Sequence, residues 1–387
     1  MAYLYRAPNN KGIEQIDRIR ILCIPMKIAH LIGQIVEFFG VSDRVMVLRK
    51  VIDFAALLQN KKVVDANLQV KDTLIENVHV RIVRPLNDNS SLPVLIYFHG
   101  GGFYMGSVDT YNTLTSTLSR SANIVVVSVN YRLAPEHPLP AGLNDCYTVA
   151  KYLLEYKQSK DLHIDPTRVI IAGDSAGGSL AAIITMRLVT HPVSKYLPRL
   201  QVLIYPSLQF FDMMLPSYRQ QHFTFLHYTS SHKLSVYLND SIDETLYFNQ
   251  HTSLEQKRWY RKYVDWSLIP IEYRTIYTNP IMDGQEGDFK LIEKMKRALE
   301  PDVSPLLVDN EQLAKLPSTY IITVGHDRLR DEGFIYARRV KRTGVDVTHK
   351  HYENTFHGSI TFLYGSLGLN IAREMVDDIV QHMKRIL

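Results

Sequence analysis

The sequence has few cysteines and no long apolar run, and these two absences exclude whole classes of protein. Only Cys23 and Cys146 occur among its 387 residues, so no disulfide framework exists and we expect two unrelated buried thiols. The most apolar stretch, residues 21–41, is interrupted by a proline, a lysine, a histidine and a glutamate. A helix that spans a bilayer needs about 20 consecutive apolar residues. The sequence therefore predicts no transmembrane segment.

Internal repeats, low-complexity tracts and Gly/Ser-rich linkers are also missing, and basic residues form no stripe. The net charge is only +5, and the lysines and arginines are scattered among 39 acidic residues. Nucleic-acid binding is therefore not expected. With 46% hydrophobic and 21% charged residues, the chain can bury a large core, which is typical of one elaborated globular domain.

The first informative motif is Gly173-Asp174-Ser175-Ala176-Gly177. The β-branched run 168–172 predicts a buried strand before it, and the small-residue run 178–184 predicts a helix after it. Ser175 would then occupy a sharp turn that projects its hydroxyl beyond the sheet, and a Cβ at Gly173 or Gly177 would collide across that turn. The pattern predicts a nucleophile elbow; a Gly/Ser-rich loop without chemistry is the alternative.

The second motif, His99-Gly100-Gly101-Gly102-Phe103, follows the apolar run 94–98. Backbone N–H groups that point at a developing oxyanion stabilise the tetrahedral intermediate of acyl transfer. Gly101 and Gly102 could supply two such donors and Ala176 a third. A phosphate-binding loop is disfavoured, because neither a Lys-Ser/Thr pair nor a spaced G-x-G-x-x-G follows.

A serine nucleophile needs a base and an acid that orients the base. Asp327 follows the predicted strand 319–325, and His357 follows the predicted strand 345–352. Both would lie at the carboxyl edge of a parallel sheet, where such sites assemble. Asp331 competes for the role of the acid, but we expect it to cap or open the helix that follows.

A metal or cofactor site is not predicted. His349 and His351 alternate on one face of a predicted strand, yet no third ligand with suitable spacing stands nearby. A solvated strand face is the preferred interpretation of this pair, and acyl transfer by the three side chains above requires no cofactor.

The chain resembles the hormone-sensitive-lipase group of α/β-hydrolases, and within it the arylacetamide deacetylase branch. The resemblance spans the chain, and five segments carry it. They are residues 97–103, 130–137, 173–178, 329–333 and 356–358. It implies that Ser175, Asp327 and His357 are nucleophile, acid and base, in agreement with the residue-level prediction.

The resemblance also implies an activity: hydrolysis of short to medium apolar or aryl esters, and of aryl amides, through an acyl-enzyme. A lipase acting on acylglycerols is one alternative. A non-catalytic small-ligand receptor is another, although the plant gibberellin receptor of this fold lacks the catalytic histidine that His357 provides here. One departure is Asn354-Thr355, which stands where a glycine usually precedes the Phe-His-Gly triplet.

The resemblance further implies association with the endoplasmic-reticulum membrane, yet this chain starts where the usual apolar anchor should end. Six apolar residues follow helical spacing here: Ile28, Leu31, Ile32, Ile35, Val36 and Phe39. We expect this stripe to pack on the protein's own cap, with peripheral membrane contact as the alternative. Oligomeric state stays open.

The predicted fold class is α/β: a mostly parallel, doubly wound sheet with a helical cap. Its strands are 72–85, 94–98, 123–129, 168–172, 201–205, 319–324 and 345–352. We divide the chain into N-terminal cap helices (1–65), a first part of the hydrolase core (66–205), a helical cap insertion rich in aromatic residues (206–290) and a second part of the core (291–387). The aromatic residues of the cap predict an apolar pocket for a small-molecule substrate.

Overall fold

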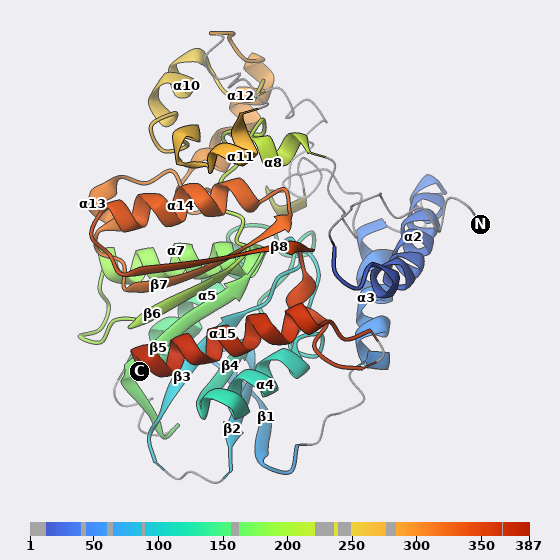
Figure 1. Cartoon of the computed structure of the whole chain (residues 1–387), viewed down its shortest axis with the longest axis vertical. Helices are drawn as coiled ribbons and strands as arrows, with labels where there is room; N and C mark the ends of the chain where they lie inside the picture. Colours follow the sequence, from blue (N-terminus) through green and yellow to red (C-terminus); the bar gives the residue numbers. More distant parts are fainter. Residues whose placement is uncertain are drawn as a thin grey trace.

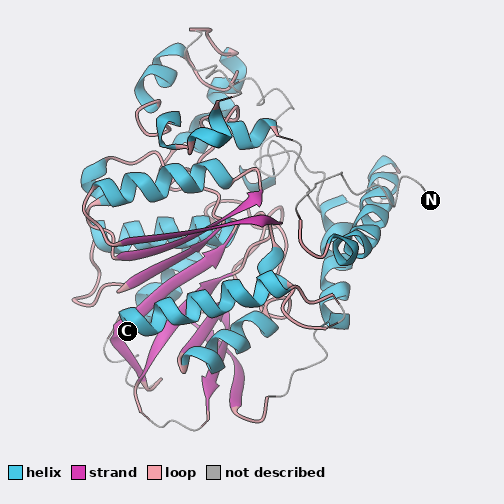
Figure 2. Ribbon diagram, in the orientation of Figure 1, coloured by secondary structure: helices cyan, strands magenta, loops and turns pink. Residues whose placement is uncertain are grey.

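An eight-stranded sheet with helices on both faces forms the centre of the molecule (Figure 1, Figure 2). The structure is a computed structural model, and it describes residues 13–39, 44–59, 65–86, 90–155, 162–220, 236–238, 249–275, 284–365 and 367–387.

The sheet is mostly parallel, as the sequence predicts. Its strands are β1 (Leu68–Ile75), β2 (Val78–Pro85), β3 (Leu92–Phe98), β4 (Val125–Val129), β5 (Ile164–Asp174), β6 (Leu200–Ile204), β7 (Ser318–His326) and β8 (Val347–Phe356). Their spatial order is β1-β2-β4-β3-β5-β6-β7-β8. Only β2 runs antiparallel to both of its neighbours, and every pair from β4 to β8 is parallel.

The prediction of a single strand over residues 72–85 is wrong. The segment is a hairpin of β1 and β2, whose register pairs Ile75 with Val78. Glu76 and Asn77 form the turn with φ values of 47° and 66°. Positive φ at both central residues is the type I′ pattern that suits a two-residue hairpin. The turn contains neither glycine nor proline, so the sequence pattern does not separate the two strands.

The central strands are buried on both faces, as parallel sheets with helices on each side require. Along β3, Val94 and Ile96 belong to the core beneath α5 (Ala141–Leu153), α7 (Ala176–Thr190) and α14 (Arg330–Arg342). Leu95 and Tyr97 belong to the core beneath α4 (Asn112–Ala122) and α15 (Asn370–Ile386). Figure 1 shows these two groups of helices on opposite faces of the sheet.

A group of short helices lies beside α14 (Figure 1), most of it within residues 206–290, the segment in which a helical cap is predicted, and we call this group and the described residues that connect its helices the cap. It comprises α8 (Pro216–Arg219), α10 (Leu254–Tyr260), a 3₁₀ turn (Trp266–Leu268), α11 (Ile271–Arg274) and α12 (Phe289–Met295). Several of its aromatic residues, Phe210, Phe211, Tyr237 and Trp266, are buried in the core, where the Trp266 indole donates to Asp212 Oδ2 at 2.8 Å. Other cap aromatics, namely Phe223, Phe225, Tyr228, Tyr247 and Phe248, lie outside the described residues.

The N-terminal segment forms α2 (Ile16–Phe38) and α3 (Arg44–Gln59), beyond the carboxyl ends of the parallel strands (Figure 1). Small residues of α2, Ala29 and Gly33, are buried, and Ala29 clusters with Val45, Leu48, Tyr104 and Met105. Among the described helices, none combines the length and apolarity that a bilayer crossing requires.

The prediction that the apolar stripe of α2 packs on the protein's own cap is wrong. Its residues Ile28, Leu31, Ile32, Ile35 and Phe39 are 42–71% exposed, Val36 is half-buried, and the adjoining Phe38 is 84% exposed. The small residues on the other side of α2 allow close packing there, so the large apolar side chains face outward.

Candidate functional site

Ser175 occupies the turn between β5 and α7. The strand ends at Asp174 and the helix begins at Ala176. Ser175 has φ 53° and ψ −118°, a conformation that a non-glycine residue adopts only when its surroundings impose it. Its N–H donates to the Ile204 carbonyl at 2.9 Å, and its carbonyl accepts from Ser179 N at 3.0 Å. The backbone on both sides of Ser175 is therefore held in place.

The glycines that flank this turn have the steric role that the sequence predicts. A Cβ added at Gly173 would lie 2.3 Å from the Gly177 carbonyl oxygen, and one at Gly177 would lie 2.0 Å from the Phe98 carbonyl oxygen. Both contacts are with backbone atoms, which cannot rotate away as a flexible side chain can.

Ser175, His357 and Asp327 form one hydrogen-bonded chain. His357 Nε2 lies 2.7 Å from Ser175 Oγ, and His357 Nδ1 lies 2.9 Å from Asp327 Oδ2. Asp327 is 2% exposed, and its other carboxylate oxygen accepts from Leu329 N at 2.9 Å. Because β7 ends one residue before Asp327 and β8 ends one residue before His357, the sheet delivers both side chains to the end at which Ser175 lies.

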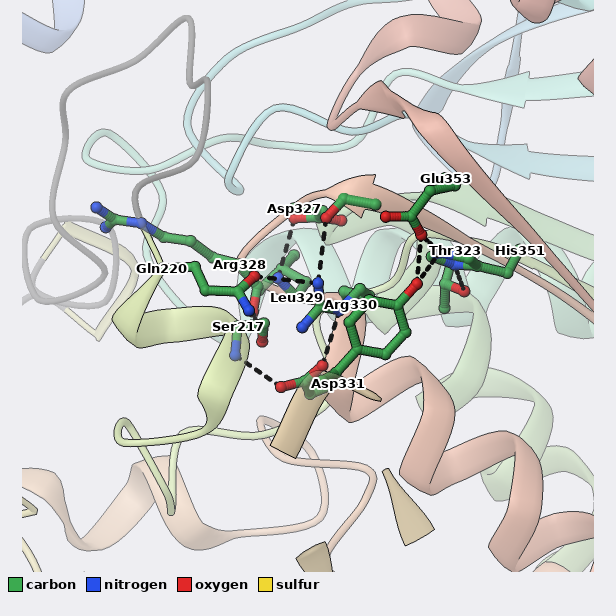
Figure 3. A network of polar contacts seen from close by, with 12 residues as sticks. Ser217, Gln220, Thr323, Asp327, Arg328, Leu329, Arg330, Asp331, His351 and Glu353 are labelled. Atoms are coloured by element: carbon green, nitrogen blue, oxygen red, sulfur yellow. Dashed lines mark hydrogen bonds and ion pairs between the residues drawn. The ribbon is translucent and has the colours of Figure 1, made fainter. Parts of the chain in front are cut away.

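Asp331, the competing acid, contacts Ser217 and Arg330 (Figure 3). Its Oδ2 accepts from Ser217 N at 2.6 Å, and its Oδ1 accepts from Arg330 Nε at 2.9 Å. The helix α14 begins at Arg330, so Asp331 opens its first turn and does not cap it. Asp331 thus joins α14 to α8 of the cap, whereas Asp327 contacts His357.

The glycines of the second motif form a tight loop after β3. Gly101 and Gly102 have φ values of 119° and 62°, and the Gly101 carbonyl accepts from Tyr104 N at 3.2 Å and from Met105 N at 3.0 Å. No hydrogen bond from the N–H of Gly101, Gly102 or Ala176 ends on a described residue. These three donors are the ones that the sequence assigns to an oxyanion.

His99 supports the loop from within the core. The ring is fully buried and stacks on Tyr131 with centroids 4.3 Å apart. Burial lowers the pKa of His99 to about 4, so the ring is neutral at pH 7. Its Nδ1 lies 2.8 Å from the Gly100 carbonyl, which makes Nδ1 the protonated nitrogen. His99 therefore braces the glycine loop.

Two further residues that the motif analysis does not single out contact this loop. Asp174 Oδ1 accepts from Gly100 N at 2.8 Å, and Arg49 of α3 donates through Nε to the Tyr104 carbonyl at 2.8 Å. A carboxylate that ends an apolar strand is a signal that could have identified Asp174. Arg49 lies in a distant helix, and no local pattern points to it.

The prediction that His349 and His351 lie on a solvated strand face is wrong. Thr323 Oγ1 lies 2.8 Å from both His349 Nε2 and His351 Nδ1, and both rings pack on Phe334 of α14. Burial lowers the pKa of His349 to about 4. In the part of the chain that the structure describes, no three His, Cys, Asp or Glu side chains are grouped as metal ligands.

Comparison with known proteins agrees with the fold and with the extent of the resemblance. The family described as "alpha/beta hydrolase fold" matches residues 95–256 and 272–361, and the one described as "Carboxylesterase family" matches residues 53–135. Arylacetamide deacetylase of Bos taurus is 34% identical, over 97% of this chain and 94% of its own length. Neutral cholesterol ester hydrolase 1 of Bos taurus is 32% identical, over 93% and 90%.

Among solved structures, a hyperthermophilic esterase of the archaeon Pyrobaculum calidifontis is similar. It superposes with a TM-score of 0.64 at 27% identity, covering 97% of this chain and 99% of its own.

The turn at Ser175 generates a prediction about stability. On helix propensity alone, Gly177→Ala in the first turn of α7 should stabilise the protein by about 1 kcal/mol. Contact of the new methyl group with the Phe98 carbonyl should instead lower the free energy of unfolding by about 1–3 kcal/mol or more. Urea denaturation of the wild type and of Gly177→Ala measures whether the free energy of unfolding rises or falls. A variant more stable than the wild type would contradict the contact between Gly177 and the Phe98 carbonyl.

Proposed function

The chain belongs to the α/β-hydrolase-fold family and, within it, to the hormone-sensitive-lipase group that includes arylacetamide deacetylase, so it is a carboxylic ester hydrolase. We propose that Ser175 is its nucleophile. The hydrogen-bonded chain from Ser175 Oγ through the His357 ring to Asp327 supports this proposal most directly. In that arrangement His357 is the general base and Asp327 orients it.

The reaction proceeds through an acyl-enzyme. His357 Nε2 accepts the Ser175 proton as Oγ attacks the ester carbonyl carbon, and the carbonyl oxygen becomes an oxyanion that accepts from the N–H groups of Gly101, Gly102 and Ala176. The bond to the alcohol then breaks, and His357 gives the proton to the departing oxygen. Water repeats the sequence on the acyl-enzyme and releases the acid. Asp327 stabilises the charged His357 ring in both halves.

The preferred substrates are esters with a short or medium acyl chain and an apolar or aromatic leaving group, and aryl amides are further candidates. Two aromatic contacts near the catalytic residues support this. Phe103, which follows the oxyanion glycines, stacks on Tyr237 of the cap at 3.9 Å, and Tyr205 packs on the His357 ring at 4.7 Å. The rings of Phe103, Tyr237 and Tyr205 are all buried, so the surroundings of the proposed catalytic residues are apolar, and an apolar site favours apolar groups. The name of the deacetylase relative also points to aromatic substrates.

Peripheral membrane contact through α2 belongs to the same proposal. The stripe of Ile28, Leu31, Ile32, Ile35 and Phe39, with Phe38 beside it, is exposed along one side of the helix. Burial of such a stripe at the boundary of a lipid headgroup layer is favourable in proportion to its apolar area. Residues of α2 and α3 also cluster with Tyr104 and Met105, so the proposed membrane-facing helix adjoins the oxyanion loop.

Substitution of the three proposed catalytic residues should abolish most turnover. We expect Ser175→Ala and His357→Ala each to lower kcat for p-nitrophenyl butyrate by roughly 10⁴-fold or more, and the double variant to lose little beyond that because the two act as a unit. We expect a loss of about 10⁴-fold for Asp327→Asn, which removes the orienting carboxylate.

Asp331→Asn is the matched control for the acid, since Asp331 is equally buried but contacts Ser217 and Arg330. It should lower stability while folded enzyme keeps most of its kcat. A greater loss of kcat in Asp331→Asn than in Asp327→Asn would reverse the assignment.

A series of esters of one phenol tests the substrate class. We expect kcat/KM to be highest for butyrate, lower for laurate and lowest for the succinate monoester, whose carboxylate would be desolvated without a partner. A steady rise through laurate and beyond would identify a lipase instead. A preference for succinate would identify an esterase for anionic substrates.

Liposome co-sedimentation tests the membrane contact. Leu31→Ser with Ile35→Ser should lower the fraction bound to vesicles by about tenfold or more, because each change removes a large apolar side chain from the interface. The matched control is Val70→Ser with Leu74→Ser on the exposed edge strand β1, where the two side chains are 47% and 63% exposed. Wild-type protein that stays wholly in the supernatant would contradict the proposal.

A further inference from the structure

A buried carboxylate stands between Ser175 and the oxyanion glycines. Asp174, the last residue of β5, is 2% exposed. Its Oδ1 accepts from Tyr97 Oη at 2.9 Å and from Gly100 N at 2.8 Å, and its Oδ2 accepts from Tyr111 Oη at 2.8 Å. Tyr97 lies on β3, and Tyr111 directly precedes α4. The carboxylate therefore joins three chain segments at the end of the sheet.

These contacts fit an ionised carboxylate. Burial raises the pKa of Asp174 above its usual value, and the hydrogen bonds from Tyr111, Tyr97 and the Gly100 N–H offset only part of that rise. All three neighbours donate, and a carboxylate accepts at both oxygens. Oδ1 has two donors and Oδ2 has one, so loss of the Tyr111 hydroxyl would leave a buried oxygen without a donor among the described residues, which is far more costly than loss of an exposed hydrogen bond. The carboxylate thus resists movement of the groups that it binds.

The approach of Asp174 to the glycine loop is too close for any side chain. A Cβ at Gly100 would lie 2.5 Å from Asp174 Oδ2 and 2.9 Å from Tyr111 Oη. Gly100 is therefore glycine because the carboxylate occupies that space. Its N–H is used by Asp174, which leaves the next two N–H groups, those of Gly101 and Gly102, to face a substrate.

We propose that Asp174 is a positioning residue that sets the distance between the Ser175 hydroxyl and the oxyanion donors. The proposal rests on the function proposed above. Asp174 is covalently next to Ser175, and its hydrogen-bond partner Gly100 is covalently next to Gly101, so one carboxylate links the nucleophile to the loop 74 residues away. Misplacement of oxyanion donors or nucleophile by about 1 Å can cost about 10²-fold in rate.

Two substitutions test this role. Asp174→Asn keeps the size of the side chain but turns an NH₂ group toward at least one of the three donors. Tyr111→Phe removes the donor to Oδ2, together with the longer contact of 3.2 Å that the hydroxyl accepts from the Gly100 N–H, and introduces no new polar group. The matched control is Tyr263→Phe, which removes the hydroxyl that donates to Asp309 at 2.8 Å, outside the site.

The readouts separate positioning from stability. Active sites are counted by titration with a fluorophosphonate, and kcat per titrated site, KM for p-nitrophenyl butyrate and the inhibition constant of a trifluoromethyl ketone are measured. The ketone forms a tetrahedral adduct whose oxyanion needs the same donors as the transition state. We expect Asp174→Asn to lower kcat by about 10²-fold and to raise the inhibition constant of the ketone by a similar factor, while KM changes less. Tyr111→Phe should lower kcat per site and the affinity for the ketone by about tenfold each. Tyr263→Phe should change neither kcat nor the affinity for the ketone.

A merely structural Asp174 would give fewer titrated sites and a lower unfolding temperature, with kcat per site and ketone affinity within twofold of wild type. That result overturns the proposal. If Asp174→Asn does not fold, the same measurements on Tyr111→Phe still decide between the two roles. A wild-type protein that neither titrates nor hydrolyses esters would overturn the proposed function, and this proposal with it. A titratable, active wild type with unaffected variants overturns only the role of Asp174.

Discussion

Close packing of the β5–α7 turn against the end of β3 is the constraint on which the site depends. Only hydrogen fits at Cα of Gly177, because the Phe98 carbonyl oxygen lies 2.0 Å from the position that a Cβ would take. Since β3 continues into the glycine loop and β5 continues into Ser175, this contact brings the proposed nucleophile and the proposed oxyanion donors to one end of the sheet. Parallel β7 and β8 then add Asp327 and His357 at the same end.

Much of the site could be predicted from sequence because its parts are local. The elbow around Ser175 and the glycines after Phe98 owe their residue types to backbone geometry within a few residues, and Asp327 and His357 each follow a strand. The parallel sheet follows from alternation of strands with helices.

The features that were missed depend on contacts distant in sequence. The hairpin at Glu76 and Asn77 has no glycine or proline to mark it, and its two strands read as one. His349 and His351 appear solvated from alternation alone, but Phe334 of α14 covers them. The outward stripe of α2 follows from the small residues that pack on its other side. Asp174 is local, yet its role emerges only when β3 and α4 supply its donors.

The segments outside the sheet contact the site through hydrogen bonds to its loops. Arg49 of α3 binds the carbonyls of Tyr104 and Ala134 and the carboxylate of Glu136. In the cap, the Ser217 N–H binds Asp331, four residues after Asp327. Tyr273 of α11 donates to Glu353 on β8, four residues before His357. The helix α3 and the cap therefore each contact a segment that carries proposed catalytic groups.

The central claim is that Ser175 is an activated nucleophile. A fluorophosphonate reacts covalently with such a serine, and mass spectrometry of the digested protein locates the adduct. We predict one adduct per folded chain, on Ser175, with labelling abolished in Ser175→Ala and strongly slowed in His357→Ala. Folded wild-type protein that carries no adduct, or carries it on another serine, would contradict the account.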